Sequence, residues 1–209
     1  MIAGMSEVTG GPRALLKRPA AYVSLQRLLG ADASHRRFAD EHIRAAAGDR
    51  VLDLGCGPGD ALRVLPDVDY LGVDLSAEYI ESARRRYGER GRFRVADVCA
   101  DDLAGEGPFA VILAMGLLHH LDDDGVRRVL SEAAGLLGPD GRFVSIDPAR
   151  APGQHAIARW LVSLDRGRHV RSADELGRLA HEAMPDLRVT VRHDLLRVPY
   201  THVVLETVR

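Results

Sequence analysis

A glycine-rich stretch, VLDLGCGPGD at residues 51–60, is the part of this sequence best suited to bring a ligand against bare backbone. Its glycines, Gly55, Gly57 and Gly59, have a G-x-G-x-G spacing rather than the G-x-G-x-x-G of a dinucleotide loop. Pro58 lacks an N–H that could have held an anion, and no lysine follows as in a P-loop. The stretch therefore predicts a loop that a ligand can approach closely but that is poorly equipped for phosphate.

Three aspartates lie at or near the ends of successive apolar runs, the first of them just before this loop: Asp53, Asp74 and Asp97. Asp53 would attract an ammonium group, directly or through water. Asp74, about twenty residues after the loop, is placed to accept hydrogen bonds from ribose hydroxyls, and Asp97 could accept from an exocyclic amine. Each could instead cap a turn. Together they predict a ligand with an amino group, a ribose and an adenine but no phosphates, which describes S-adenosylmethionine.

Histidines and one further aspartate are the candidates for proton transfer. Moving a methyl group from a sulfonium to oxygen or nitrogen depends on positioning and on removing a proton from the acceptor. His119 and His120 follow the apolar run Phe109–Ala114, and Asp147 ends the run Gly141–Asp147. His169 lies further along the chain. Histidine suits a base near neutral pH, but a structural role for either member of the pair also fits, and Asp147 could orient a substrate or cap a turn.

Short apolar strands and intervening helices are predicted to position these residues. The predicted strands, buried on both faces as in a parallel sheet, are Arg50–Leu54, Tyr70–Asp74, Arg92–Ala96, Phe109–Ala114 and Gly141–Asp147. The predicted helices are 12–29, 33–47 ending at Gly48, Asp60–Leu65, Ser76–Tyr87, Asp123–Leu137, Pro152–Asp165 and Ala173–Ala183. This alternation implies right-handed crossovers and a doubly wound α/β sheet.

The C-terminal residues depart from that alternation. Leu187–Asp194 and Tyr200–Val208 are predicted strands with too few residues between them for a crossover helix, so they form an antiparallel hairpin. No repeat or linker is evident, and residues 1–209 are predicted to be a single domain. Its parts would be an N-terminal helical cap (1–48), a cofactor-binding core (49–148), a substrate lid (149–186) and the hairpin (187–209).

Composition narrows the class of protein. The 209 residues are 46% apolar and 28% charged, which is typical of a globular domain, and the net charge of −2 gives no sign of a nucleic-acid-binding face. Two cysteines, Cys56 and Cys99, make neither a disulfide framework nor a zinc cluster, and the histidine spacing suggests no metal site. Because no signal peptide or membrane span is evident, we expect a cytoplasmic location.

Five stretches together resemble the class I S-adenosylmethionine-dependent methyltransferases, in the family's order and spacing. They are VLDLGCGPGD (51–60), YLGVDLSAEYIESARRRYG (70–88), FRVADV (93–98), FAVILAMGLLHHLDD (109–123) and LLGPDGRFVSIDP (136–148). The resemblance implies a Rossmann-like, seven-stranded sheet in the order 3-2-1-4-5-7-6, with the last strand antiparallel. It also implies S-adenosylmethionine as the cofactor.

The resemblance places the cofactor at the ends of the first four strands. Around the methionine part, the implied contacts are Gly55, Cys56, Gly57 and Gly59, preceded by Asp53. At the ribose the implied contact is Asp74, and at the adenine the implied contacts are Leu75, Asp97 and Val98. The sulfonium would be faced by Ala114 and Met115. AMGLLHH stands where enzymes that methylate amino groups of adenine or glutamine have an Asn/Asp-Pro-Pro-aromatic motif, so that substrate class is not expected. GLLHHL is similar to the small-molecule branch of the family.

Candidate substrate contacts lie mainly in the C-terminal third. LDRGRHVRSADE gathers arginines around one glycine in an insertion where this fold often builds a lid, and arginines could grip an acidic substrate. A solvated charged loop is the default interpretation of such a run. The predicted substrate-binding residues are Tyr22, Arg36, Arg166, Arg168, His193 and Tyr200.

The sequence therefore predicts a methyltransferase that acts at oxygen or nitrogen of a small metabolite. The metabolite would be polar or anionic, such as a sugar or a product of secondary metabolism. The protein would be a monomer or homodimer with no nucleic-acid or membrane partner. Two alternatives stay open: a methyltransferase of protein or RNA, and a member of the fold that binds the cofactor without transferring methyl.

Overall fold

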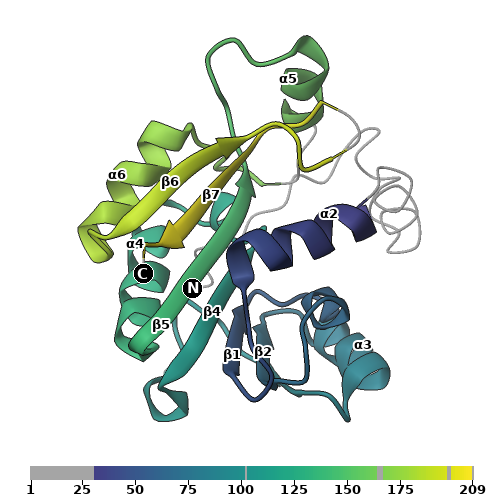
Figure 1. Ribbon diagram of the computed structural model, residues 1–209. Helices are drawn as coiled ribbons and strands as arrows, with labels where there is room; N and C mark the ends of the chain where they lie inside the picture. Colours follow the sequence, from purple (N-terminus) through teal and green to yellow (C-terminus); the bar gives the residue numbers. More distant parts are fainter. Residues whose placement is uncertain (1–30, 102, 164–166, 197–198, 209) are drawn as a thin grey trace.

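A single seven-stranded sheet organises the chain in the computed structural model, which describes residues 31–101, 103–163, 167–196 and 199–208 (Figure 1). The strand order is β3-β2-β1-β4-β5-β7-β6, as predicted. β1 to β5 are parallel, and β7 runs antiparallel to both β5 and β6. The strands are β1 Arg50–Leu54, β2 Asp69–Asp74, β3 Arg92–Val95, β4 Phe109–Met115, β5 Leu137–Pro148, β6 Leu187–Arg192 and β7 His202–Thr207.

Helices cover both faces of this sheet. The α-helices are α2 Ala31–Phe38, α3 Ala77–Tyr87, α4 Asp123–Leu136, α5 Ala156–Ser163 and α6 Ala173–Ala183. A π-helical turn, η2 (Ala39–Ile43), continues α2, and the short 3₁₀ turns are η3 Asp60–Arg63, η4 Ala104–Glu106 and η5 Leu118–His120. Ser76, Asp122 and Ser172 accept backbone N–H bonds at the starts of α3, α4 and α6, which fixes where those helices begin.

Two apolar clusters form the core, one on each face of the sheet. Leu52 belongs to the cluster that includes α4 and α6, whereas its neighbour Val51 belongs to the cluster that includes α2, η2 and α3. This alternation is the expected result of side chains that point to opposite faces along a strand. The carboxyl ends of β1, β2, β4 and β5 are thereby held at one edge, where the predicted site residues lie.

Several predicted boundaries were wrong. The helix predicted over 33–47 ends at Ile43, because Arg44 adopts a left-handed conformation (φ 51°) and its N–H bonds to the Ala39 carbonyl. β5 begins at Leu137, before the predicted turn at 138–141. Leu137 pairs with Phe109 and Arg142 pairs with Val111, so residues 138–141 form an irregularity between two paired parts of β5. The helix predicted over 12–29 lies outside the described residues.

The hairpin strands are shorter than predicted. β6 ends at Arg192 and β7 begins at His202, so His193 and Tyr200 lie in the connection rather than in the strands. The rings of Tyr200 and His202 nevertheless lie side by side, with centroids 4.8 Å apart.

A carboxylate is buried inside β1. Asp53 is 1% exposed; the Tyr70 hydroxyl donates to its Oδ2 at 2.6 Å, and its Oδ1 has no hydrogen-bond partner among the described residues. Loss of solvation raises the pKa of Asp53 to about 7, although the Tyr70 hydrogen bond acts in the opposite direction. Because the pKa is raised on folding, Asp53 favours the folded state when protonated, and this contribution is lost as the pH rises through about 7.

Asp53→Asn should therefore flatten the pH dependence of stability. Between about pH 5 and about pH 8 the wild type should lose on the order of 2 kcal/mol more free energy of unfolding than the variant, measured by urea denaturation. Asp69→Asn, at the exposed start of β2, is the control and should keep the wild-type slope. Parallel curves for Asp53→Asn and the wild type would contradict the assignment.

Gly72 lets the glycine loop lie against β2. A Cβ at this position would lie 2.8 Å from the Cys56 sulfur and 2.9 Å from the Tyr70 ring. Gly72→Ala should lower the free energy of unfolding by about 1–3 kcal/mol because of overpacking. Gly135→Ala in α4 meets no atom within 4 Å and should stabilise by up to about 1 kcal/mol through helix propensity. Equal effects of the two substitutions in urea unfolding would refute this packing argument.

Candidate functional site

The loop after β1 exposes bare backbone at one point. Gly55, Gly57 and Gly59 have φ angles of 69°, 53° and 80°, which only glycine adopts readily. A Cβ on Gly55 would lie 2.8 Å from the Leu117 side chain, so that part of the loop is packed. A Cβ on Gly57 would meet no atom within 4 Å. The loop therefore offers open backbone at Gly57, as the motif predicted.

The Asp74 carboxylate joins this loop to the end of β2. Its Oδ2 accepts the Gly57 N–H and its Oδ1 accepts the Ser76 N–H, each at 2.8 Å. Burial raises the pKa of Asp74, and the two N–H bonds partly offset that effect. Each carboxylate oxygen keeps a second lone pair, so Asp74 can still accept bonds from ligand hydroxyls.

The ends of β2 and β3 border the same loop. Leu75 follows β2 and is 38% exposed although it is apolar. Asp97 is half-buried and its Oδ1 accepts the Cys99 N–H at 2.9 Å, whereas Val98 is buried. An exposed apolar side chain next to half-buried carboxylate oxygens suits a flat heteroaromatic ring that carries an amino group.

The two cysteines are not nucleophiles in this arrangement. Burial raises the pKa of the Cys56 thiol well above its ordinary value, and it raises the pKa of Cys99 to about 11. Both thiols therefore stay protonated near neutral pH. Cys56 packs within the apolar core on the α3 side.

β4 contributes one partly accessible side chain to the edge. Ala114 is fully buried, so of the two residues expected to face the sulfonium, Met115, which is half-buried, is the one with accessible surface. Gly116 follows with φ 69°, and its N–H bonds to the Ile146 carbonyl at 2.8 Å. This bond holds the turn after β4 against the end of β5.

A buried histidine–carboxylate pair lies at the ends of β4 and β5. Asp147 Oδ1 accepts the backbone N–H of His119 at 3.1 Å and lies 2.7 Å from its ring Nδ1. When Nδ1 donates its proton to this oxygen, Nε2 is the acceptor nitrogen of the ring. Asp147 Oδ2 is buried without a partner among the described residues, which marks unused polar capacity at this edge.

The other candidate proton-transfer residues adjoin this pair. The rings of His120 and His119 lie side by side, with centroids 4.1 Å apart and planes tilted by 39°. The His169 N–H donates to the His119 carbonyl at 3.1 Å. The structure therefore brings together all four residues for which the sequence predicted proton transfer, although they come from three separate segments.

The predicted substrate contacts are less concentrated. Tyr22 and Arg166 lie outside the described residues. Arg36, on α2, and Arg168, before α6, are exposed. His193 Nδ1 lies 3.1 Å from the Thr201 hydroxyl, beside Tyr200. A joint role for these residues in substrate binding stays a prediction.

Sequence reasoning missed two buried polar groups. Arg171, predicted as part of a solvated loop, is 9% exposed and fully hydrogen-bonded. His42 lies 2.9 Å from Glu206 and 2.8 Å from Arg192, which links η2 to the hairpin. No local pattern marks these residues, because each depends on partners far along the chain.

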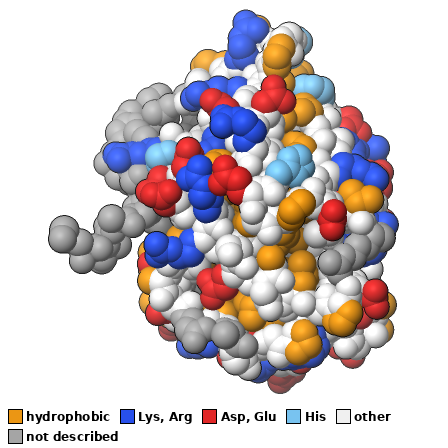
Figure 2. All heavy atoms as spheres, turned by 90° about the vertical axis from the view of Figure 1, so that its left-hand side faces the viewer, with side chains coloured by type: hydrophobic (Ala, Val, Ile, Leu, Met, Phe, Trp, Pro, Cys, Tyr) orange, Lys and Arg blue, Asp and Glu red, His pale blue; other side chains and the backbone are white. Residues whose placement is uncertain are grey.

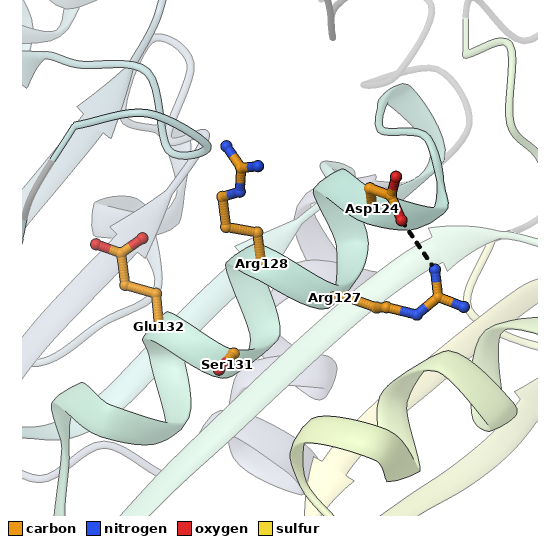
Figure 3. Close-up of a pocket in the computed structure, with 5 residues that line it drawn as sticks. All are labelled: Asp124, Arg127, Arg128, Ser131 and Glu132. Carbon is orange, nitrogen blue, oxygen red and sulfur yellow. Dashed lines mark hydrogen bonds and ion pairs between the residues drawn. The ribbon is translucent and has the colours of Figure 1, made fainter.

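The surface away from the strand ends offers no comparable arrangement among the described residues. A shallow hollow on α4 is lined by Asp124, Arg127, Arg128, Ser131 and Glu132 (Figure 3). Arg127 pairs with Asp124 at 3.2 Å and with Glu182 at 2.6 Å, so its charge is already engaged. On the face drawn in Figure 2, acidic and basic side chains are interspersed rather than gathered in a stripe of one sign.

The described residues lack two further features. They contain no group of three or more side chains arranged to hold a metal ion. None of their helices is long and apolar enough to cross a membrane.

Comparison with known proteins identifies a methyltransferase family and several methyltransferase relatives. A family model described as a methyltransferase domain matches residues 24–183. The trans-aconitate 2-methyltransferase of Pseudomonas aeruginosa is 33% identical over 133 residues, 59% of this chain and 43% of that protein. The demethylmenaquinone methyltransferase of Thermus thermophilus is 33% identical over 135 residues, 60% of each chain. The matches thus span about half the length of these relatives.

A solved structure extends the likeness over the whole fold. A chain of the Haloferax volcanii complex between the Trm112 methyltransferase activator and a methyltransferase superposes with a TM-score of 0.68. The match covers 96% of this chain and 99% of that one at 19% identity, which speaks for the fold alone. The family match spans well over half of the chain, and the strand order and glycine motif agree with it. The chain therefore belongs to the methyltransferase-domain family, among the class I S-adenosylmethionine-dependent methyltransferases.

Proposed function

We propose that this protein transfers the methyl group of S-adenosylmethionine to oxygen or nitrogen of a small, polar or anionic metabolite. The observation that carries the proposal is the Asp74 carboxylate, which joins the open backbone at Gly57 to the start of α3. It leaves carboxylate lone pairs, bare backbone and the exposed Leu75 side by side. These are the features that a nucleoside with a short amino-acid chain and no phosphates requires.

The residues at this edge fit the cofactor group by group. Asp74 would hold the ribose hydroxyls, Leu75 and Val98 would pack against the adenine, and Asp97 would accept from its amine. The methionine part would lie over Gly57. Asp53 is too deeply buried to touch an ammonium group in this arrangement, so it would act through water or through its charge.

The His119–Asp147 pair would serve as the base. The cofactor supplies an electrophilic methyl with a good leaving group, which leaves alignment and proton removal to the protein. Asp147 holds the His119 ring by Nδ1, and Nε2 would be the nitrogen that accepts the proton of the acceptor's hydroxyl or amine. His120 and His169 would help to shape this corner rather than take the proton.

An anionic acceptor is supported by one relative and by charge. The named activity of that relative concerns trans-aconitate, an anion, whereas the activity of the second relative concerns demethylmenaquinone, an apolar quinone. The arginines predicted to contact substrate, Arg36, Arg166 and Arg168, would favour an anion. Residues 1–48 and 149–186 would form the cap and lid over it, within a single domain of 1–209 that acts as a monomer or homodimer.

A macromolecular substrate is the main rival. The net charge of −2 and the interspersed charges of Figure 2 favour a metabolite over RNA. A cofactor-binding protein without transferase activity is the second rival, and the ordered His119–Asp147 pair disfavours it because cofactor binding alone needs no base.

Asp74→Ala should weaken binding of S-adenosylmethionine and S-adenosylhomocysteine by about 10- to 100-fold, because hydrogen bonds to an ionised group are lost. Isothermal titration calorimetry measures this. Asp69→Ala removes a carboxylate from the other end of the same strand and should leave the affinity unchanged. Wild-type binding of NAD without binding of either sulfur compound would contradict the proposal.

His119→Gln should slow methyl transfer by about 10²-fold or more while the KM for S-adenosylmethionine stays unchanged, because proton removal is lost but cofactor contacts are not. Mass spectrometry of a metabolite mixture first identifies the methylated product, and initial rates follow. His181→Gln, on α6 and bonded to the Leu187 carbonyl, is the control. A rate for His119→Gln close to that of the wild type would show that His119 is not the base, and a product methylated on carbon would refute the acceptor assignment.

A further inference from the structure

Arg171 is a buried cation in a segment expected to be solvated. It lies between α5 and α6 and is 9% exposed, whereas Arg168 nearby is exposed. Burying a guanidinium is costly unless its charge and its N–H groups are satisfied. Its hydrogen-bond partners therefore explain why Arg171 is buried.

All five N–H groups of Arg171 are engaged. Nε and Nη2 donate to one Asp123 carboxylate oxygen at 3.0 and 2.7 Å. Nη2 also donates to the Leu121 carbonyl at 2.9 Å, and Nη1 donates to the carbonyls of Leu118 and His169 at 3.1 and 3.2 Å. A lysine, with three donors on a flexible stem, could not make this set.

These bonds surround the turn that carries His119. The Leu118 and Leu121 carbonyls lie on either side of the histidine pair, and Asp123 begins α4 directly after it. One guanidinium thus fixes the backbone before and after His119 and joins it to residues 167–172, which we call the strap. The Arg150 N–H bonds to the Arg171 carbonyl at 3.0 Å, so the strap is also tied to the end of β5.

The strap touches His119 directly. The His169 N–H donates to the His119 carbonyl at 3.1 Å. At Gly167 there is no room for a side chain, because a Cβ would collide with the His119 ring and lie 2.5 Å from its carbonyl oxygen. The atom that meets it on the ring is Cδ2.

These contacts determine where the ring nitrogens point. Nδ1 faces Asp147, Cδ2 faces Gly167, and a Cβ on Gly116 would lie 3.8 Å from Cε1. Nε2 stands between Cδ2 and Cε1 in the imidazole ring. It is therefore directed between the strap and the turn after β4.

We propose that Arg171 is a positioning residue for His119, acting through the strap. It holds the turn of η5 so that Asp147 fixes one ring nitrogen and the other faces the acceptor side of the cofactor site. This role deepens the proposed function and rests on it. Arg171 touches neither cofactor nor acceptor in this account, so it should affect the state of His119 and not the affinity for the cofactor.

The test is a measurement of the His119 ring itself. Long-range ¹H–¹⁵N spectra of ¹⁵N-histidine-labelled protein report which ring nitrogen carries the proton, and His119→Asn identifies the signal. The wild type should show one Nδ1–H tautomer, with and without S-adenosylhomocysteine. Arg171→Gln should give a tautomer-averaged signal while its affinity for S-adenosylhomocysteine stays within about twofold, since binding contacts at distant sites are independent.

Matched variants separate positioning from general stability. Arg168→Gln, an exposed arginine of the same strap, should leave the His119 signal unchanged. Arg171→Lys should not restore it, because the ammonium group lacks the donors. Gly167→Ala keeps the buried cation but displaces the strap, and it should alter the same signal. It therefore decides the matter if Arg171→Gln does not fold.

An unchanged His119 signal in folded Arg171→Gln would overturn the proposal, as would an unchanged signal in Gly167→Ala when Arg171→Gln is unfolded. If the wild type does not bind S-adenosylhomocysteine, the proposed function fails instead. The spectra recorded without ligand then still decide whether Arg171 fixes the His119 ring.

Discussion

The hydrogen bond from the Gly57 N–H to the Asp74 carboxylate joins the carboxyl ends of two neighbouring strands, and the candidate site depends on it. It requires the positive φ angles of the glycine loop, and it requires β1 and β2 to be parallel so that both end at the same edge. Gly72 and the buried Asp53–Tyr70 pair lie beneath this junction and support it. A side chain at Gly57 would fill the space that the account assigns to the cofactor.

The ends of β4 and β5 supply the second half of the site by a comparable device. Asp147 binds both the backbone and the ring of His119, as Asp74 binds two backbone groups. In each case one carboxylate at a strand end orders the turn after a neighbouring strand. The strap adds Arg171, whose bonds to the Leu118 and Leu121 carbonyls fix the same turn. The turn that carries His119 is therefore held in place next to the open glycine loop. This arrangement suits a reaction whose rate depends mainly on the alignment of the reacting groups.

Residues that act through local pattern were predictable from the sequence, and residues that act through distant partners were not. The glycine loop and the ends of β1 and α6 follow from local spacing, the strand order was implied by the family resemblance, and the structure agrees with each. The end of the helix before Gly48 was missed because a left-handed Arg44 has no sequence signature. The burial of Arg171 was missed because its partners precede it by about fifty positions, so composition alone made it resemble the exposed Arg168.

A crystal structure with bound S-adenosylhomocysteine tests the central claim most directly. The account predicts the ribose hydroxyls on the Asp74 carboxylate, the amino-acid chain over Gly57, and the sulfur beside Met115 with His119 Nε2 facing the acceptor side. The same experiment would contradict it if the ligand occupied another part of the surface, or if it bound at this edge with Asp74 bonded only to Gly57 and Ser76.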